Sequence, residues 1–286
     1  MKNIYWIASY PKSGNTLVRL FLSCYFFTSD GKLTDFNVIK NITIFNNINI
    51  FKKIDGFCNK KEFIENPSLI SSYWLKAQKK LFDLNPKKVF FFKTHNSRIQ
   101  YNNNYFTNEK YTKGFIYIVR DPRSVLVSTK NHYNYPSYKK SLDNLFSDKH
   151  LSLAKYHVLP EFLLSWKTNY LSWKNFLNDN PELGIIVKFE DLVNNSKKTF
   201  SKIITFIQKK QKIKFDIDKF DNCLKSINFN NLKKIELTFG FDEKSSSGNN
   251  FFRKGLVDEW KKELPEEIID EIERKYYDEM KEIGYL

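Results

Sequence analysis

The most telling part of this chain is Tyr10-Pro11-Lys12-Ser13-Gly14-Asn15-Thr16, a short polar segment between two apolar runs. The run before it, Ile4–Ala8, predicts a buried strand, and the run after it, Leu17–Phe27, predicts a helix. A loop that opens a helix presents unpaired backbone N–H groups to an anion, with the helix dipole behind them. Lys12 adds a full positive charge, and two hydroxyl side chains add donors. The segment therefore predicts a loop that binds a phosphate-like anion.

The order of residues in this loop differs from the Walker pattern, in which the lysine directly follows the second glycine. Here Lys12 precedes Gly14. This inverted order of lysine and glycine therefore helps to decide which class of phosphate chemistry the site carries out.

The composition predicts one folded domain that covers residues 1–286. The chain is 41% hydrophobic and contains 27 phenylalanines, which is typical of a globular protein with a full core. No internal repeat and no Pro/Gly-rich linker interrupts it. Its formal net charge of +15 suits an anionic ligand, such as a nucleotide, an acidic sugar, a membrane or a nucleic acid. A general preference for Lys, Asn, Ile and Phe would also produce this charge.

The cysteines and the apolar runs indicate the compartment. Cys24, Cys58 and Cys223 are widely separated and odd in number, so we expect unpaired thiols in a reducing compartment. The N-terminal apolar run is too short for a signal peptide, and no run approaches the roughly 18 apolar residues of a membrane span. These features predict a cytoplasmic protein without integral membrane association.

The apolar and helical segments predict the α/β fold class. Four short apolar runs are typical of buried strands: Ile4–Ala8, Val89–Phe92, Phe115–Val119 and Ile185–Phe189. Helical patterns cover Thr16–Phe27, Ser124–Asn131, Pro160–Leu177, Lys197–Lys209 and Glu266–Ile283. Continuous apolar runs separated by helices predict a central parallel sheet covered on both faces, a three-layer α/β/α arrangement.

Three polar segments, 29–66, 96–113 and 134–157, do not fit the sheet. Ligands of α/β proteins bind beyond the carboxyl ends of the strands, where the connecting segments gather. The three insertions are therefore candidate walls of a substrate pocket. Plain surface decoration is the alternative.

Polar clusters follow the predicted strands. Lys93-Thr94-His95 follows the second, and Arg120-Asp121-Pro122-Arg123 follows the third, with Ser128 further along. The carboxyl ends of parallel strands share one edge, so these clusters converge on the anion loop. They predict a site for a multiply anionic ligand with one candidate base, His95. No metal-ligand cluster occurs in the sequence, so we expect no metal.

The set of motifs resembles the sulfotransferases that use 3′-phosphoadenosine-5′-phosphosulfate (PAPS), of the soluble cytosolic type and its bacterial relatives. The anion loop is similar to the 5′-phosphosulfate loop of that family, and the segment from Ile118 to Ser128 to its 3′-phosphate motif. Arg253-Lys254-Gly255, with Trp260-Lys261, is similar to its C-terminal signature. The matches occur in order from Ile4 to Lys261. The resemblance implies a P-loop-like nucleotide-binding fold.

The resemblance also implies a role for each matching residue. His95 is the general base, Lys93 contacts the transferred sulfuryl group, and Lys12 stabilises the leaving phosphate. Ser128 is expected in both the catalytic and the donor-binding set. The implied donor-binding residues are Lys12, Ser13, Gly14, Asn15, Thr16, Arg120, Ser128, Phe229, Arg253, Lys254 and Gly255. Phe229 packs on adenine in this view, and a plain core position is the alternative.

The implied reaction moves a sulfuryl group from PAPS to an acceptor hydroxyl or amine by in-line displacement and leaves the product PAP. Fixed cations and backbone donors lower the barrier of such a displacement, as in phosphoryl transfer. The expected acceptor is a small molecule, a glycan or a lipid, and a homodimer is compatible with the resemblance. The chain departs from the family at Leu17, where a tryptophan is usual, and at Phe189, where a tyrosine is usual.

Two alternatives belong to other classes of function. An ATP- or GTP-dependent kinase with an atypical phosphate loop lacks the Walker lysine and an acidic strand end for magnesium. A basic nucleic-acid-binding protein would use the net charge, but the sequence has no RNA-binding aromatic motif, helix-turn-helix signature or zinc site. We therefore expect no nucleic-acid partner.

Overall fold

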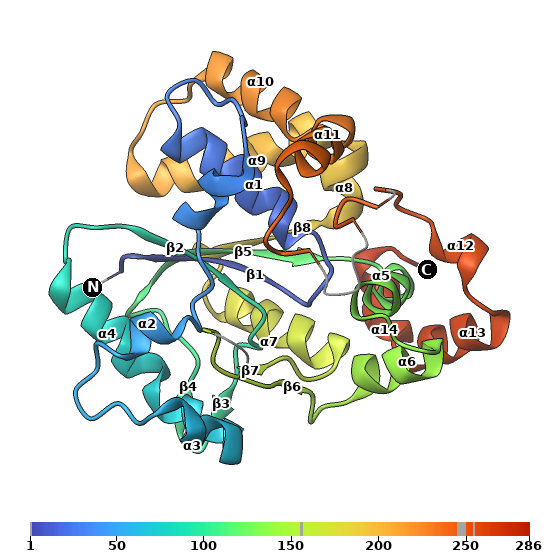
Figure 1. The fold of residues 1–286 in the computed structure, drawn as a ribbon, viewed down its shortest axis with the longest axis horizontal. Coiled ribbons are helices and arrows are strands. Elements are labelled where there is room, and N and C mark those ends of the chain that lie inside the picture. The colour runs from blue at the N-terminus through green and yellow to red at the C-terminus, as the bar shows by residue number, and fades with distance from the viewer. Residues whose placement is uncertain (1, 155–156, 245–249, 254) are drawn as a thin grey trace.

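Four parallel strands form the centre of the molecule (Figure 1). The computed structural model describes residues 2–154, 157–244, 250–253 and 255–286. The strand order is β2-β1-β5-β8, with β1 at Ile4–Ser9, β2 at Phe90–Thr94, β5 at Thr112–Val119 and β8 at Gly184–Lys188. These are the four predicted strands, with small shifts at their ends. Phe189, predicted as the end of the last strand, instead begins a helix.

The two faces of the sheet bury different side chains of the same strand. Trp6 and Ala8 of β1 join one hydrophobic cluster, while Tyr5 and Ile7 join the other. Because successive side chains of a strand point to opposite faces, a strand that is covered on both sides must be apolar throughout. The structure confirms the three-layer α/β/α class.

Helices cover both faces of this sheet (Figure 1). One layer contains α1 (Asn15–Phe27), α8 (Phe189–Asn194), α9 (Ser196–Gln211), α10 (Ile217–Ser226) and α11 (Phe229–Phe239). The other contains α4 (Trp74–Leu84), α5 (Pro122–Tyr133), α6 (Tyr138–Phe146), α7 (Trp166–Asp179), α13 (Glu266–Lys275) and α14 (Tyr277–Ile283). None of the helices within the described ranges is long and apolar enough to cross a membrane.

Short elements complete the fold. They are α2 (Ile48–Phe51), α3 (Lys60–Glu65), α12 (Trp260–Glu263), the 3₁₀ helices η1 (Phe36–Asn41) and η2 (Pro67–Tyr73), and the strands β3 (Gln100–Tyr101), β4 (Asn104–Tyr105), β6 (Leu151–Ser152) and β7 (Glu161–Phe162). The pairs β3-β4 and β6-β7 are antiparallel.

Two predicted helices differ from the structure by more than small shifts at their ends. The prediction for Pro160–Leu177 is wrong at its start, because β7 pairs with β6 and α7 begins only after Ser165. The Ser165 side chain accepts the amide N–H of Thr168 and caps that helix. The last predicted helix is broken at Tyr276, whose buried hydroxyl donates to the carbonyl of Leu145 at 2.7 Å.

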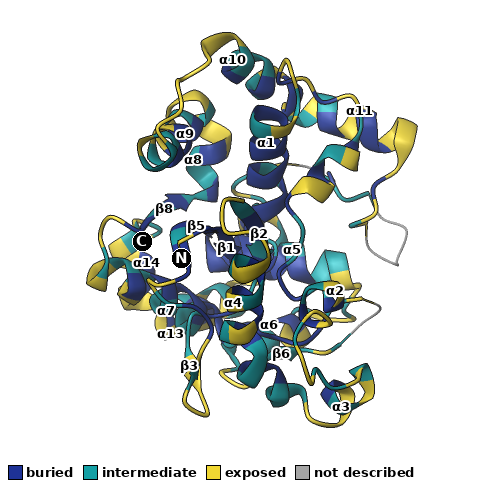
Figure 2. Cartoon of the chain, turned by 90° about the vertical axis from the view of Figure 1, so that its left-hand side faces the viewer, coloured by how far each residue is buried: buried dark blue, intermediate teal, exposed yellow. Residues whose placement is uncertain are grey.

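The insertion 29–66 contributes apolar side chains to the core and is therefore more than surface decoration. Phe45 and Phe51 are fully buried. Figure 2, coloured by burial, shows α1 largely in the dark blue of buried residues. The backbone of this segment also lies against the end of β2, because Phe45 N–H donates to Lys93 O and Lys93 N–H donates to Thr43 O, both at 2.9 Å. The insertion therefore supports the strand end that carries Lys93 and His95.

Candidate active site

The anion loop is held in an unusual backbone conformation. Lys12 and Gly14 both have positive φ, 66° and 96°. At Gly14 a Cβ atom would lie 2.4 Å from the Phe189 ring, so no larger residue fits there without a shift. The loop turns back over the end of β1, and α1 starts directly after it. The first amides of α1 then face the same edge of the sheet as the other strand ends.

Asn15 fixes this helix start to the strand before it. Its Nδ2 donates to the carbonyl of Ile7 at 2.8 Å and to Ser9 Oγ at 3.2 Å. The side chain is therefore used inside the protein. Its backbone amide belongs to the first turn of α1, which keeps the predicted role for that group open.

Three predicted cations meet at the sheet edge. Burial, with the nearby Lys93 and Arg120 as further causes, lowers the pKa of Lys12 to about 7. Burial likewise lowers the pKa of Lys93 and of Arg120. Ser13 Oγ and Arg120 Nε are buried and have no hydrogen-bond partner within the described part of the chain. Concentrated positive charge with spare donors fits an anionic group.

Arg120 is positioned by the loop and by an aromatic ring. Its Nη1 donates to the carbonyl of Lys12 at 2.9 Å, and its guanidinium lies 4.2 Å from the centre of the Phe189 ring. The same ring contacts Gly14. The Phe189 ring therefore packs against both the anion loop and Arg120. The resembled family commonly has a tyrosine at this position.

One ring nitrogen of His95, Nδ1, forms a hydrogen bond with the protein backbone. Its Nδ1 lies 2.7 Å from the carbonyl of Ser9. A carbonyl oxygen can only accept, so Nδ1 carries the hydrogen and Nε2 keeps its lone pair in the neutral ring. Burial, with Lys93 as a further cause, lowers the pKa of His95 to about 3. The imidazole is thus neutral at physiological pH, with Nε2 able to accept a proton.

The backbone around His95 is held by two side chains. Its N–H donates to Glu161 Oε1 at 2.9 Å, and Asn169 Nδ2 donates to its carbonyl at 2.9 Å. Both partners are buried. They were missed by sequence reasoning because nothing in their local pattern links them to a strand end far away in the chain.

The Thr16 hydroxyl and two cations, Lys93 and Arg19, share one carboxylate, that of Glu243. Glu243 accepts from Thr16 Oγ1 at 3.0 Å and from Arg19 Nη1 at 2.6 Å, and lies 3.9 Å from Lys93 Nζ. Burial raises the pKa of Glu243, but Lys93 and Arg19 together outweigh it and bring the pKa to about 2. Neither Arg19 nor Glu243 was predicted; the spacing of Arg19 one helical turn after Thr16 was the signal available in the sequence.

The remaining predicted donor-binding residues, apart from Ser128, lie in the C-terminal part of the chain. Arg253 forms ion pairs with Glu259 and Glu263. Phe229 begins α11, and its ring lies 2.4 Å from where a Gly255 Cβ would be. Ser128 is half-buried on α5. Lys254 lies outside the described residues. The structure thus gives contacts for the Arg253 and Phe229 positions, whereas no contact of the Ser128 side chain identifies its role.

Two further histidines approach the anion loop. His132 on α5 has its pKa lowered to about 4 by burial and by the nearby Lys12 and Lys93. His150 Nδ1 lies 3.5 Å from the Tyr10 hydroxyl. The insertion 134–157 therefore reaches the loop, as a pocket wall would.

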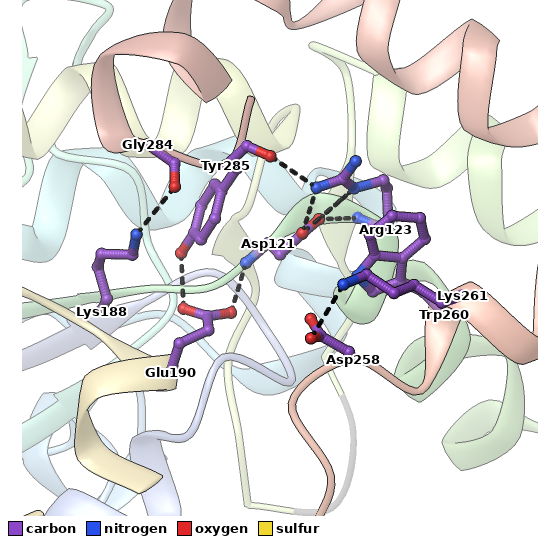
Figure 3. A pocket seen from close by; sticks show the side chains of 9 residues that line it. All are labelled: Asp121, Arg123, Lys188, Glu190, Asp258, Trp260, Lys261, Gly284 and Tyr285. Atoms are coloured by element: carbon purple, nitrogen blue, oxygen red, sulfur yellow. Dashed lines mark hydrogen bonds and ion pairs between the residues drawn. The ribbon is translucent and has the colours of Figure 1, made fainter. Parts of the chain in front are cut away.

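A cavity of about 320 Å³ lies next to the cationic edge but contains none of the predicted catalytic residues (Figure 3). Several of its polar groups pair with one another. Arg123 pairs with Asp121 at 2.7 Å, and the Tyr285 hydroxyl donates to Glu190 at 2.8 Å. This region fastens the C-terminal residues to the start of α5. No group of three or more His, Cys, Asp or Glu side chains that could hold a metal occurs in the residues that the structure describes.

Fold and candidate site together define a P-loop-like α/β protein in which buried cations lie beside a neutral histidine. Residues 3–284 match the family of the sulfotransferase domain, so the chain belongs to the sulfotransferase family.

Known proteins share parts of the sequence and most of the fold. The chain is 26% identical over 173 residues to 3-beta-hydroxysteroid sulfotransferase of Cavia porcellus, which covers 58% of this chain and 55% of that protein. It is 29% identical over 152 residues to sulfotransferase 2A1 of Rattus norvegicus, with coverage of 51% and 49%. The chain thus spans about half the length of the curated relatives it matches.

Solved structures show the shared fold. Mouse sulfotransferase SULT7A1 complexed with PAP superposes with a TM-score of 0.61 at 19% identity, covering 98% of this chain and 84% of that chain. Retinol dehydratase in complex with androsterone and the inactive cofactor PAP gives a TM-score of 0.62 at 16% identity, covering 97% and 80%.

Proposed function

We propose that this chain transfers a sulfuryl group from PAPS to the hydroxyl or amine of an acceptor. The observation that carries the proposal is the meeting of Lys12, Lys93 and Arg120 with a neutral His95 at one sheet edge. Membership of the sulfotransferase family supports the same chemistry. PAPS supplies an activated sulfuryl group on a phosphate leaving group.

The described residues fit an anionic nucleotide. The positive-φ loop opens a helix N-terminus, and Ser13 Oγ and Arg120 Nε are buried donors without a partner in the described ranges. The loop and Thr16 would hold the 5′ end. Arg120, Ser128, Arg253, Lys254 and Gly255 would hold the 3′-phosphate, and Phe229 would contact the adenine. Lys12 and Lys93 would carry positive charge where negative charge builds during transfer.

His95 would take the proton from the acceptor. The bond between acceptor oxygen or nitrogen and sulfur forms, the bond between sulfur and the bridging phosphate oxygen breaks, and PAP leaves. The proton passes to Nε2, which the Nδ1 contact to Ser9 leaves free. Because the imidazole is neutral, no prior deprotonation is needed.

The proposed acceptor is a small molecule that carries a hydroxyl group. The structurally similar retinol dehydratase was solved with androsterone, and the matched guinea-pig relative is named for hydroxysteroids. Both examples point to a small molecule with a hydroxyl group. Tyr10 and the insertion 134–157 would line its pocket beside His95. A glycan or lipid acceptor and a homodimer stay predictions.

Two measurements test the function. Saturating PAP is expected to raise the melting temperature, because a ligand that binds only the folded state stabilises it. Radiolabelled PAPS with fractionated cell extract is expected to label an acceptor. Failure of both PAPS and PAP to stabilise the protein would sink the proposal. A magnesium requirement would favour the kinase alternative, and salt-sensitive DNA binding without a PAP effect would favour the nucleic-acid alternative.

A further inference from the structure

Arg19 is a buried cation outside the predicted set. It lies one helical turn after Thr16 on α1, so the two side chains share a helix face. Its Nε donates to the carbonyl of Ile42 at 3.0 Å, which fixes the guanidinium, and the side chain is 4% exposed. A guanidinium removed from water needs an anion beside it. Here the carboxylate of Glu243 supplies that charge, at 2.6 Å from Nη1.

The Glu243 carboxylate also contacts two side chains that are expected to bind the sulfuryl donor. Thr16 Oγ1 donates to Glu243 Oε2 at 3.0 Å, and Lys93 Nζ lies 3.9 Å from that oxygen. Thr16 belongs to the anion loop, and Lys93 is expected to contact the sulfuryl group. A phosphate or sulfuryl group cannot use these donors while Glu243 lies on them.

We propose that Arg19 is a further ligand for the anionic end of the donor, and that Glu243 is an internal anion that the donor replaces on Arg19, Thr16 and Lys93. The identity of the donor as PAPS rests on the proposed function; the anion site does not. The positive charge of Arg19 is balanced in both states, by the Glu243 carboxylate in the ligand-free protein and by the anionic donor in the complex.

The charges and exposures of the groups favour replacement of Glu243 by the donor. A carboxylate carries one negative charge, whereas a terminal phosphate carries up to two and has three acceptor oxygens. Lys12 and Arg120 lie nearby and add positive charge that Glu243 alone does not balance. The Glu243 side chain is 27% exposed and Arg19 only 4% exposed, so the carboxylate is the partner that can turn toward water. Phe241 keeps the segment in place by packing against Phe36 and Phe252.

The first test compares two neighbouring acids. Glu243→Gln removes the internal anion. Asp242→Asn makes the same charge change at a side chain that is 84% exposed and pairs with Lys40. Calorimetry with PAP and with inorganic pyrophosphate is expected to show about fivefold or tighter binding for Glu243→Gln, because a competing occupant is gone. Asp242→Asn is expected to match the wild type.

The outcomes separate the two proposals. Unchanged or weaker binding of both probes by Glu243→Gln would overturn the internal-anion role. Wild-type protein that binds pyrophosphate but not PAP would contradict the proposed function while leaving the pyrophosphate comparison valid.

A double-mutant cycle tests Arg19 itself. Arg19→Gln is expected to weaken PAP binding more in the Glu243→Gln background than in the wild type, since only there does the ligand gain the whole guanidinium interaction. Unchanged PAP affinity of the Arg19→Gln variant in the Glu243→Gln background would show that Arg19 does not bind the donor, and a lowered melting temperature of the ligand-free protein would then assign it a structural role only.

A measurement on unmodified protein avoids any folding defect of the variants. Carbodiimide labelling of carboxyl groups, read by mass spectrometry, is expected to increase at Glu243 when PAP or pyrophosphate binds. Asp242 is the internal control and should not change. Decreased labelling at Glu243 would show that the ligand covers it rather than displaces it, and the proposal would fall.

Discussion

Gly14 and Gly255 lie at the two ends of the proposed donor site and share one local geometry. Both have positive φ, 96° and 66°, and in both a Cβ atom would lie 2.4 Å from a phenylalanine ring. Their surroundings differ. Phe189, above Gly14, is buried at the edge of the sheet and also touches Arg120, whereas Phe229, above Gly255, is only half-buried. The strand-end side of the site is therefore shaped by the core, and the C-terminal side by contacts near the surface.

The arginines of the two sides differ in the same way. Arg120 is buried and its Nη1 donates to a backbone carbonyl, which is a neutral partner. Arg253 is 32% exposed and already pairs with the carboxylates of Glu259 and Glu263. A ligand gains more from a cation whose charge is not yet neutralised. The comparison predicts that the strand-end residues dominate both rate and affinity.

The largest effect is expected at His95. His95→Ala should lower the transfer rate by about 10²- to 10⁴-fold, because the acceptor loses its base, while PAP affinity stays near the wild-type value. Transfer assays with labelled PAPS and PAP calorimetry measure the two quantities. His132→Ala is the matched histidine control and should lose far less rate. Substantial turnover by His95→Ala would remove the base assignment.

The next effect separates the two arginines. Arg120→Ala should weaken PAP binding by about tenfold to hundredfold, the range of a buried charged hydrogen bond. Arg253→Ala should weaken it by no more than about fivefold, since breaking its exposed ion pairs offsets part of the gain. Calorimetry at one fixed salt concentration decides between them. Equal losses of PAP affinity in the two variants would contradict the proposed difference between the strand-end side and the C-terminal side of the site.

The pH dependence of binding follows from Lys12. Its pKa of about 7 means that ligand-free protein carries the proton below pH 7 and loses it above. An anion favours the charged lysine and raises its pKa, so a proton must be taken up on binding at higher pH. PAP affinity should therefore fall by up to about tenfold per pH unit above pH 7. Lys12→Gln should flatten this slope, and an unchanged slope in that variant would assign the titration to another group.

The smallest effect is on folding, and it tests the two glycines directly. Gly14→Ala should lower the melting temperature by about 4–10 °C, because both the backbone and the buried Phe189 ring resist a Cβ. Gly255→Ala meets a half-buried ring that can shift, so its melting temperature should fall by less, about 2–4 °C. Thermal unfolding of the two variants without ligand measures this. The reverse order would mean that the C-terminal side is the more rigid one.

Local patterns in the sequence were sufficient for the sheet and its strand-end chemistry. Buried parallel strands must be apolar on both faces, so Ile4–Ala8 and Phe115–Val119 were recognisable, and the polar residues directly after each strand had to share one edge. That places Lys12, Lys93, His95 and Arg120 together without any long-range information. The helix over 160–165 was wrong because β7 depends on pairing with β6, a contact that no local pattern carries.

Tertiary structure alone decided the charge states and the partners from distant parts of the chain. Burial and neighbouring cations lower the pKa of His95, so that the ring is neutral, and bring the pKa of Lys12 to about 7; neither follows from residue type. Likewise, Glu243 reaches Arg19 and Thr16 only because α1 and the segment after α11 lie side by side in the fold. The chain's local order determines which groups face the strand-end edge. Long-range packing determines their protonation and which internal anion lies among them, because both depend on the dielectric and on neighbours remote in sequence.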